Sequence, residues 1–415
     1  MLQTVNYIGT FELLKNLFDQ SRDAIEIPGH RARLVNCTFC SASQSLLPGA
    51  RTYFCDTHSL EFHEEGLQGT ENMLFQHIKG LTVADIHSRS NSEFRYTIFK
   101  PHGVEKSRAV ILLLHGLNER YWDKYLPWAL RLVELTGSCV CLVPIAFHMN
   151  RAPLEWSSPK LMNAVAQERQ NRYPSIVSSS FANAAISTRL QNIPQRFVWS
   201  GVQTYDDIMQ LVRQIRSGSH PHVAEGARID VFAYSIGAFL AEIMFMSNRG
   251  GTFSDSRLFM FCGGATFDRM YPVSKYIIDS EALICLYSFF VEHLETECKR
   301  DPRLNHYFNE GHTSGLYFKA MLANRKLKDV REKRFREISS QLMAVAVRQD
   351  EVVQPSEVLN TLNGDFRDVP IPVRILDFPS RCSHVNPFPI QKSIAGEVNE
   401  SFDQVFDLAM SHFGR

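Results

Sequence analysis

Residues 228–246 read RIDVFAYSIGAFLAEIMFM, and the prediction of the fold starts from this stretch. A short apolar run typical of a strand ends at AYSIG, residues 233–237, and a run that favours helix follows at once. A serine at such a strand-to-helix turn, with small residues two positions before and after it, is typical of a nucleophile elbow. The neighbours must be small because the turn is strained and the serine oxygen has to stay exposed. The N-terminus of the following helix directs its free N–H groups to the same place.

Ala233 stands two positions before Ser235, where the pattern usually has glycine, and alanine is still small enough for that place. A buried strand that merely ends in serine is the alternative interpretation of this stretch taken alone. The rest of the chain has to decide between the two.

Length and composition limit the possible functions. The 415 residues predict one large domain with insertions, or two domains. Lys plus Arg and Asp plus Glu both total 44, so the zero net charge gives no electrostatic reason to expect a nucleic acid or an anionic membrane as partner. No apolar run approaches the about 18 residues of a membrane span, and the N-terminus lacks the pattern of a signal peptide. Nine cysteines, scattered and odd in number, favour free thiols in a reducing cytoplasm.

Strands and helices alternate along most of the sequence. Helices are expected over 1–20, 121–135, 203–215 and 394–413, and strands over 72–86, 94–100, 109–114, 138–143, 228–233, 258–262, 341–347 and 373–378. This alternation predicts an α/β fold with a mostly parallel central sheet and helices on both faces.

Two long segments, 147–196 and 263–340, follow the C-terminal ends of predicted strands. Because open parallel sheets keep their ligand sites at that edge, we expect both segments to form caps over a site. Residues 1–70 are expected to form an N-terminal extension, and residues 71–415 the main domain.

Polar groups follow three further strands. The sequence HGLN at 115–118 comes after one of them, and a glycine there leaves N–H groups free for an oxyanion hole. Asp350 comes after the strand at 341–347, where an acid is well placed to orient a histidine. His384 lies in the loop after the last strand.

The order serine, aspartate, histidine, each after a successive strand, resembles the α/β-hydrolase superfamily over about residues 70 to 415. The resemblance implies a catalytic triad and an oxyanion hole made by five residues: the nucleophile Ser235, the general base and acid His384, the orienting acid Asp350, and the N–H donors Leu117 and Ile236. It implies a serine hydrolase that cleaves a small-molecule ester through an acyl-enzyme, without a cofactor. Acyl transfer, thioester cleavage and an inactive binding protein of the same fold are the alternatives.

Other residues compete for a role at this site. Asp268 and Asp377 are alternative acids, and Asp268 follows the predicted strand at 258–262. His148 and Arg151 lie after the strand at 138–143 and are candidate substrate contacts, since an arginine can fix an anionic group. Ordinary loop packing is the alternative for both.

Four N-terminal residues have the spacing of zinc ligands. Cys37 and Cys40, then Cys55 and His58, form the pattern C-x2-C…C-x2-H. Two such pairs can complete a tetrahedral zinc site. We expect a structural zinc site that stabilises a small polar segment or recruits a partner, with free thiols as the alternative.

Overall fold

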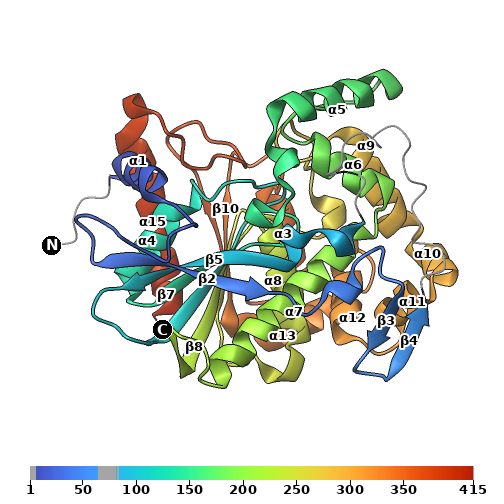
Figure 1. Cartoon of the computed structure of the whole chain (residues 1–415), viewed down its shortest axis with the longest axis horizontal. Coiled ribbons are helices and arrows are strands. Elements are labelled where there is room, and N and C mark those ends of the chain that lie inside the picture. The colour runs from blue at the N-terminus through green and yellow to red at the C-terminus, as the bar shows by residue number, and fades with distance from the viewer. Residues whose placement is uncertain (1–5, 64–80, 82–83, 415) are drawn as a thin grey trace.

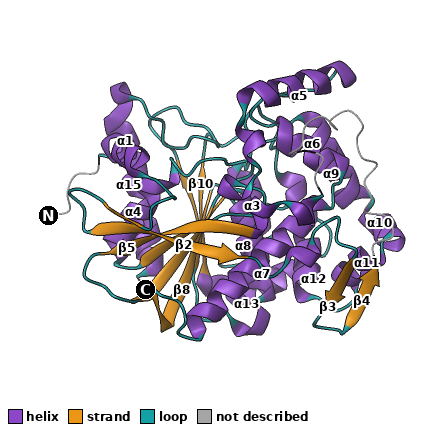
Figure 2. Cartoon of the chain, in the orientation of Figure 1, coloured by secondary structure: helices purple, strands orange, loops and turns teal. Residues whose placement is uncertain are grey.

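The computed structural model describes residues 6–63, 81 and 84–414. A nine-stranded sheet crosses the molecule in the order β1-β2-β5-β7-β6-β8-β9-β10-β11 (Figure 2). The strands are β1 (Ala24–Glu26), β2 (Ala32–Cys40), β5 (Glu93–Pro101), β6 (Ser107–Leu114), β7 (Cys139–Val143), β8 (Val223–Tyr234), β9 (Leu258–Phe261), β10 (Leu342–Val347) and β11 (Val373–Leu376). All neighbours from β7 to β11 run parallel, whereas β1, β2 and β5 pair antiparallel. The predicted α/β class is confirmed.

Helices cover both faces of this sheet. They are α1 (Tyr7–Leu17), α3 (Arg89–Ser92), α4 (Tyr125–Thr136), α5 (Pro159–Arg172), α6 (Ala184–Asn192), α7 (Arg196–Arg216), α8 (Ile236–Ser247), α9 (Ser280–Tyr287), α10 (Leu294–Arg300), α11 (Pro302–Asn309), α12 (Thr313–Leu322), α13 (Lys328–Ile338), α14 (Pro355–Leu362) and α15 (Ala395–Phe413). Every residue of β7, β9 and β10 is buried, because a parallel sheet between two helical layers has no solvated face.

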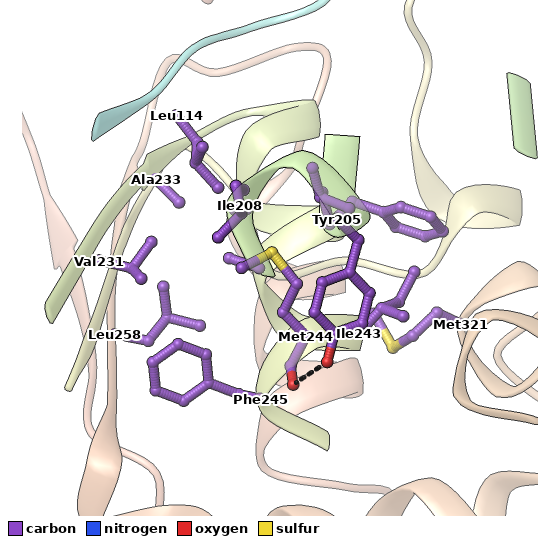
Figure 3. Packing of buried hydrophobic residues seen from close by; sticks show 14 of the residues in the cluster. Leu114, Tyr205, Ile208, Val231, Ala233, Ile243, Met244, Phe245, Leu258 and Met321 are labelled. Atoms are coloured by element: carbon purple, nitrogen blue, oxygen red, sulfur yellow. Dashed lines mark hydrogen bonds between the residues drawn. The ribbon is translucent and has the colours of Figure 1, made fainter. Parts of the chain in front are cut away.

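Each face of the sheet has its own core. On one face α1, α4 and α15 pack around Trp128, which is fully buried among aromatic rings that include Phe406. On the other face α7 and α8 pack against the sheet, and Figure 3 shows Ile208 of α7 facing the strand residues Leu114 and Ala233, with Tyr205 further from the sheet. The Tyr205 hydroxyl donates to the Met244 carbonyl at 3.4 Å, so its polar atom is satisfied inside this core. Burying one large apolar side chain contributes about 1.5–3 kcal/mol to the stability of the fold. The two packed layers therefore hold the sheet in place.

The two long segments predicted as caps are helical. Residues 147–196 carry α5 and α6, and residues 263–340 carry α9 to α13. A separate two-stranded hairpin, β3 (Thr52–Cys55) and β4 (Leu60–His63), lies beside α11 and α12 (Figure 1). The segments predicted as caps and the hairpin therefore lie on the same side of the molecule.

The expected N-terminal extension is not a separate unit. Residues 24–40 supply β1 and β2 of the central sheet, and α1 packs against α4 and α15. The boundary expected near residue 70 lies outside the described residues, as does most of the strand predicted over 72–86. Asp85–His87, at the end of that range, form a 3-10 helix instead. Within the described part of the chain, no helix is long and apolar enough to cross a membrane.

Candidate active site

Ser235 sits alone between β8 and α8, in a backbone conformation that side chains rarely adopt. Its φ is 56° and its ψ is −122°. Such a conformation persists only where the surroundings enforce it. Gly237 is part of that enforcement, because a Cβ atom there would lie 2.7 Å from the His115 carbonyl oxygen and 2.8 Å from that of Leu114. A residue larger than glycine two positions after the serine would therefore collide with the end of β6, which explains the predicted need for a small residue there.

The structure brings Ser235, His384 and Asp350 into one hydrogen-bonded chain. The Ser235 Oγ lies 2.7 Å from His384 Nε2, and His384 Nδ1 lies 2.8 Å and 3.0 Å from the two carboxylate oxygens of Asp350. An ionised carboxylate can only accept, so Nδ1 carries the proton and the lone pair of Nε2 faces the serine hydroxyl. All three side chains are buried, at 8%, 5% and 4% exposure, which keeps competing water away from their hydrogen bonds.

The alternative acids lie elsewhere. Asp268 accepts hydrogen bonds from the Thr266 hydroxyl and the Asn324 backbone N–H. Asp377 is exposed and pairs with Arg348 at 3.0 Å. Of the three acids considered, Asp350 is the one that contacts His384.

Neighbouring groups hold the acid and the histidine in place. Asp350 Oδ1 also accepts from the N–H groups of Val352 and Val353, each at 2.9 Å, so the turn after β10 fixes the carboxylate. Tyr234 stacks on the His384 ring, with centroids 5.6 Å apart, and its hydroxyl donates to the His384 carbonyl. Sequence reasoning missed this role of Tyr234, although its place directly before the serine was a usable signal.

Cys262 lies against Asp350. Burial, reinforced by the nearby Asp350 charge, raises the pKa of the Cys262 thiol well above its usual value. The thiol therefore stays protonated and can donate to the carboxylate.

The predicted oxyanion-hole residues flank the serine. Among the described residues, the N–H groups of Leu117 and Ile236 donate to no acceptor of the protein. His115 shapes the first of these loops, because its Nδ1 donates to the Gly116 carbonyl at 2.8 Å and its Nε2 accepts from the Ile145 N–H at 2.9 Å. Burial lowers the pKa of His115 well below its usual value, so the ring is neutral, as this pair of bonds requires.

A mainly apolar cavity opens beside Leu117 and Ile236. It runs between α6, α7, α8 and α12, and its walls include Ile186, Leu190, Phe197, Phe239, Ile243 and Phe318. The segments predicted as caps thus supply part of its wall.

His148 lines the same cavity. Its Nδ1 donates to the Ala146 carbonyl at 2.9 Å, and among the described residues its Nε2 has no partner. Burial lowers the pKa of His148 to about 3. The ring is therefore neutral, and its Nε2 is an unpaired acceptor buried in the cavity wall.

Arg151 does not have the predicted role. It is completely buried, its guanidinium forms an ion pair with Asp207 at 2.8 Å, and it donates to the carbonyl groups of Asn91 and Pro144. These partners occupy the charged group, so Arg151 stabilises the loop after β7 and cannot reach a substrate.

The predicted zinc ligand set is wrong in two of its four members. Cys37 and Cys40 lie on β2, paired with β5 in the central sheet. Cys55 and His58 lie in the β3–β4 hairpin, where His306 and His312 join them in place of the first two cysteines. Sequence reasoning missed this pair of histidines because they are about 250 residues further along the chain.

The sheet topology, the elbow after β8, and the acid and histidine after β10 and β11 together define an α/β-hydrolase fold. The chain belongs to the family of unknown function DUF6051, whose pattern matches residues 5–414. None of the curated proteins matches the chain by sequence.

Solved structures with a similar fold include several esterases. Carboxyl esterase 2 of the mycorrhizal fungus Tuber melanosporum is 10% identical, with 78% of this chain and 81% of that chain covered and a TM-score of 0.42. A thermostable esterase of Pseudomonas putida is 11% identical, with 78% and 80% covered and a TM-score of 0.41. A hyperthermophilic esterase of the archaeon Pyrobaculum calidifontis is 15% identical, with 77% and 80% covered and a TM-score of 0.37.

Proposed function

We propose that the protein is a serine hydrolase that cleaves carboxylic esters through an acyl-enzyme intermediate. The observation that carries this proposal is the hydrogen-bonded chain from Ser235 Oγ through His384 to Asp350. A serine hydroxyl is a weak nucleophile by itself, and an adjacent base that is oriented by a third group activates it.

In the proposed reaction, His384 Nε2 takes the hydroxyl proton while Ser235 Oγ attacks the ester carbonyl. The negative charge that develops on the carbonyl oxygen is stabilised by the N–H groups of Leu117 and Ile236. The His384 imidazolium, stabilised by Asp350, then gives its proton to the departing alkoxide. A water molecule activated by His384 hydrolyses the acyl-enzyme by the same steps, and this chemistry requires no cofactor.

The cavity favours an uncharged, largely apolar acyl group. Its two arginines, Arg189 and Arg196, both pair with the single carboxylate of Asp85, which offsets one of the two charges and holds both guanidinium groups at that ion pair. His148 is neutral and can accept one hydrogen bond from a hydroxyl or amide on the substrate. We infer that the substrate carries an apolar acyl chain with at most one such donor.

Arg120 supports a second candidate, thioester cleavage or acyl transfer with a partner that carries an anionic group. It lines a separate hollow with Leu117 and Ser383, on the other side of the oxyanion loop. Its Nη2 donates to Asn118, but among the described residues its Nε and Nη1 have no partner. A guanidinium beside this hollow suits a carboxylate or phosphate on the leaving group.

Labelling with a fluorophosphonate probe tests the proposed nucleophile. We expect covalent modification of the wild type that is lost in Ser235→Ala and His384→Ala. Ser383→Ala is the matched control, since it removes a hydroxyl next to His384 that has no part in the triad, and it should label like the wild type. Failure of folded wild-type protein to react would contradict the proposal and favour an inactive binding protein.

A panel of esters then separates the two candidates. Hydrolysis of p-nitrophenyl esters of increasing acyl length should improve while the chain fills the apolar cavity. A preference for thioesters with an anionic leaving group, reduced at least tenfold in kcat/KM by Arg120→Met, would favour the second candidate instead.

We also propose a cytoplasmic location. All nine cysteines are free in the structure, and free thiols persist in a reducing compartment. Measurement of the fraction of the protein in the cytosol of fractionated cells tests this.

A further inference from the structure

Four side chains far apart in the sequence meet at one point beside the caps. Cys55 ends β3, His58 lies in the following turn, His306 belongs to α11, and His312 directly precedes α12. Figure 1 shows the hairpin of β3 and β4 next to these helices. One potential ligand atom from each residue lies within 4.8 Å of all the others.

Four of the six separations between these atoms fit a tetrahedron around one metal ion, and the other two are no longer than 4.8 Å. With Zn–N near 2.05 Å and Zn–S near 2.3 Å, a tetrahedron separates two nitrogens by about 3.3 Å and sulfur from nitrogen by about 3.6 Å. The Cys55 Sγ lies 3.5 Å from His58 Nδ1 and 3.4 Å from His312 Nε2. His306 Nε2 lies 3.2 Å from His58 Nδ1 and 3.1 Å from His312 Nε2.

The orientation of the rings agrees with this arrangement. The three imidazole planes are mutually perpendicular, at 87°, 87° and 88°, so three nitrogens converge on one centre from different directions. Hydrophobic stacking does not require this convergence, whereas a shared cation does.

His306 also has the partner that a metal-bound histidine usually has. Its second nitrogen, Nδ1, lies 3.0 Å from the Glu310 carboxylate, which fixes the proton on Nδ1 and leaves the lone pair of Nε2 directed at the cluster. Metal-binding histidines commonly donate their other N–H to a carboxylate in this way. His306 is 1% exposed and Cys55 2%, so the site is anchored inside the protein.

We propose that Cys55, His58, His306 and His312 bind one zinc ion. One thiolate and three imidazoles are borderline-soft ligands. In a tetrahedral arrangement they bind zinc in preference to magnesium or calcium. Zinc displaces the Cys55 thiol proton on binding, and four protein ligands leave no open position for a substrate or a reactive water. The site is structural.

The ion holds the hairpin to the cap. An isolated two-stranded hairpin has marginal stability, and this one is not part of the central sheet. Tyr307 of α11 and Phe318 of α12 line the apolar cavity. His306 also belongs to α11, and His312 directly precedes α12. Zinc therefore also fixes part of the cavity wall, independently of the chemistry at Ser235.

Metal analysis of the full chain tests the proposal. The protein is to be produced without a histidine tag, purified without chelators, and assayed for zinc, copper, nickel, iron and cobalt together. We expect about one zinc per chain. Cys55→Ser and His306→Ala should lose it, whereas the matched control Cys37→Ala/Cys40→Ala should retain it, because those cysteines lie in the central sheet.

A second measurement uses the wild type alone, so it does not depend on the folding of a variant. Replacement of the ion by Co²⁺ should give the intense visible bands of a tetrahedral site and a thiolate-to-metal charge-transfer band, and removal of metal by a chelator should lower Tm. Zinc-free wild type that gains neither zinc nor the cobalt spectrum on reconstitution would overturn the proposal. So would one zinc per chain that persists in both ligand variants. Copper in place of zinc would overturn the assignment of the metal. Because none of these readouts uses catalysis, they succeed or fail separately from probe labelling at Ser235.

Discussion

At the scale of single residues, the backbone of Ser235 is strained at the residue whose hydroxyl is the proposed nucleophile. A non-glycine residue at φ 56° costs on the order of 1–3 kcal/mol. The sheet holds it there, because the Ser235 N–H donates to the Phe261 carbonyl of β9 at 3.2 Å and the backbone of Gly237 lies close to the end of β6. The position of the Ser235 hydroxyl, the proposed nucleophile, is therefore coupled directly to the register of the parallel strands β6, β8 and β9.

Replacement of Gly237 by alanine should displace the elbow. The added methyl group would contact two backbone carbonyl groups below 3.0 Å, and the backbone cannot yield as a flexible side chain does. We expect Gly237→Ala to lower kcat/KM at least tenfold and to cost about 1–3 kcal/mol of unfolding free energy. Gly396→Ala, at an open position in the first turn of α15, is the control and should leave activity unchanged. Wild-type activity in Gly237→Ala would contradict this account of the elbow.

The buried carboxyl group of Glu242 should make the stability of the protein depend on pH in an unusual way. It is fully buried in α8, and among the described residues neither carboxyl oxygen has a hydrogen-bond partner. Burial raises its pKa well above 4.5, so the folded protein keeps it neutral. Below its unfolded pKa such an acid is protonated in both states, so its ionisation does not affect stability. As the pH rises from the unfolded pKa to the folded pKa, the acid ionises in the unfolded chain only, and this lowers the free energy of unfolding.

The test compares wild type with Glu242→Gln, which has the same shape and no charge. The unfolding free energy of the wild type should fall relative to that of the variant between pH 5 and pH 8, by at most about 1.4 kcal/mol per pH unit. Urea denaturation at several pH values measures both. Parallel pH profiles of the two proteins would show that Glu242 is not held neutral.

At the scale of elements, one buried ion pair joins the two inserted segments. Arg169 of α5 forms two hydrogen bonds of 2.8 Å to Asp279, which also caps the N-terminus of α9. Both side chains are almost completely buried, at 2% and 0% exposure. The two segments predicted as caps are therefore linked directly to each other.

Asp279→Ala should separate the caps. It leaves the Arg169 charge buried without its counter-ion, which typically costs 3–5 kcal/mol, and removes a helix cap worth about 1 kcal/mol. We expect faster proteolysis within residues 147–196 and a lower Tm. Glu337→Ala, which breaks an exposed pair with Arg334, is the control and should cost less than about 1 kcal/mol. Equal protease resistance in both variants would exclude a linking role for Asp279.

At the scale of the whole molecule, the sequence predicted most of the sheet from β6 to β10, because strands buried on both faces are continuous apolar runs. It did not predict β1 and β2, since β2 alternates apolar residues with arginine, asparagine and threonine and resembles a polar loop. Ser235, Asp350 and His384 could be placed together because the ends of parallel strands share one edge. The partner of Arg151 and the meeting of His306 and His312 with Cys55 could not be predicted, since long helical insertions set those contacts.

The contact between α1 and α15 bears on how the chain comes to be folded. The Tyr7 N–H donates to the side chain of Asn399 at 3.0 Å across 392 residues of sequence, and the Tyr7 ring packs on Phe402. A ribosome adds about 5–20 residues per second, so roughly 20–80 s pass between the synthesis of these two partners. During that time the apolar face that α15 finally covers has no native partner. Closure of the layer around Trp128 therefore has to wait for the synthesis of α15 and is a late event in folding.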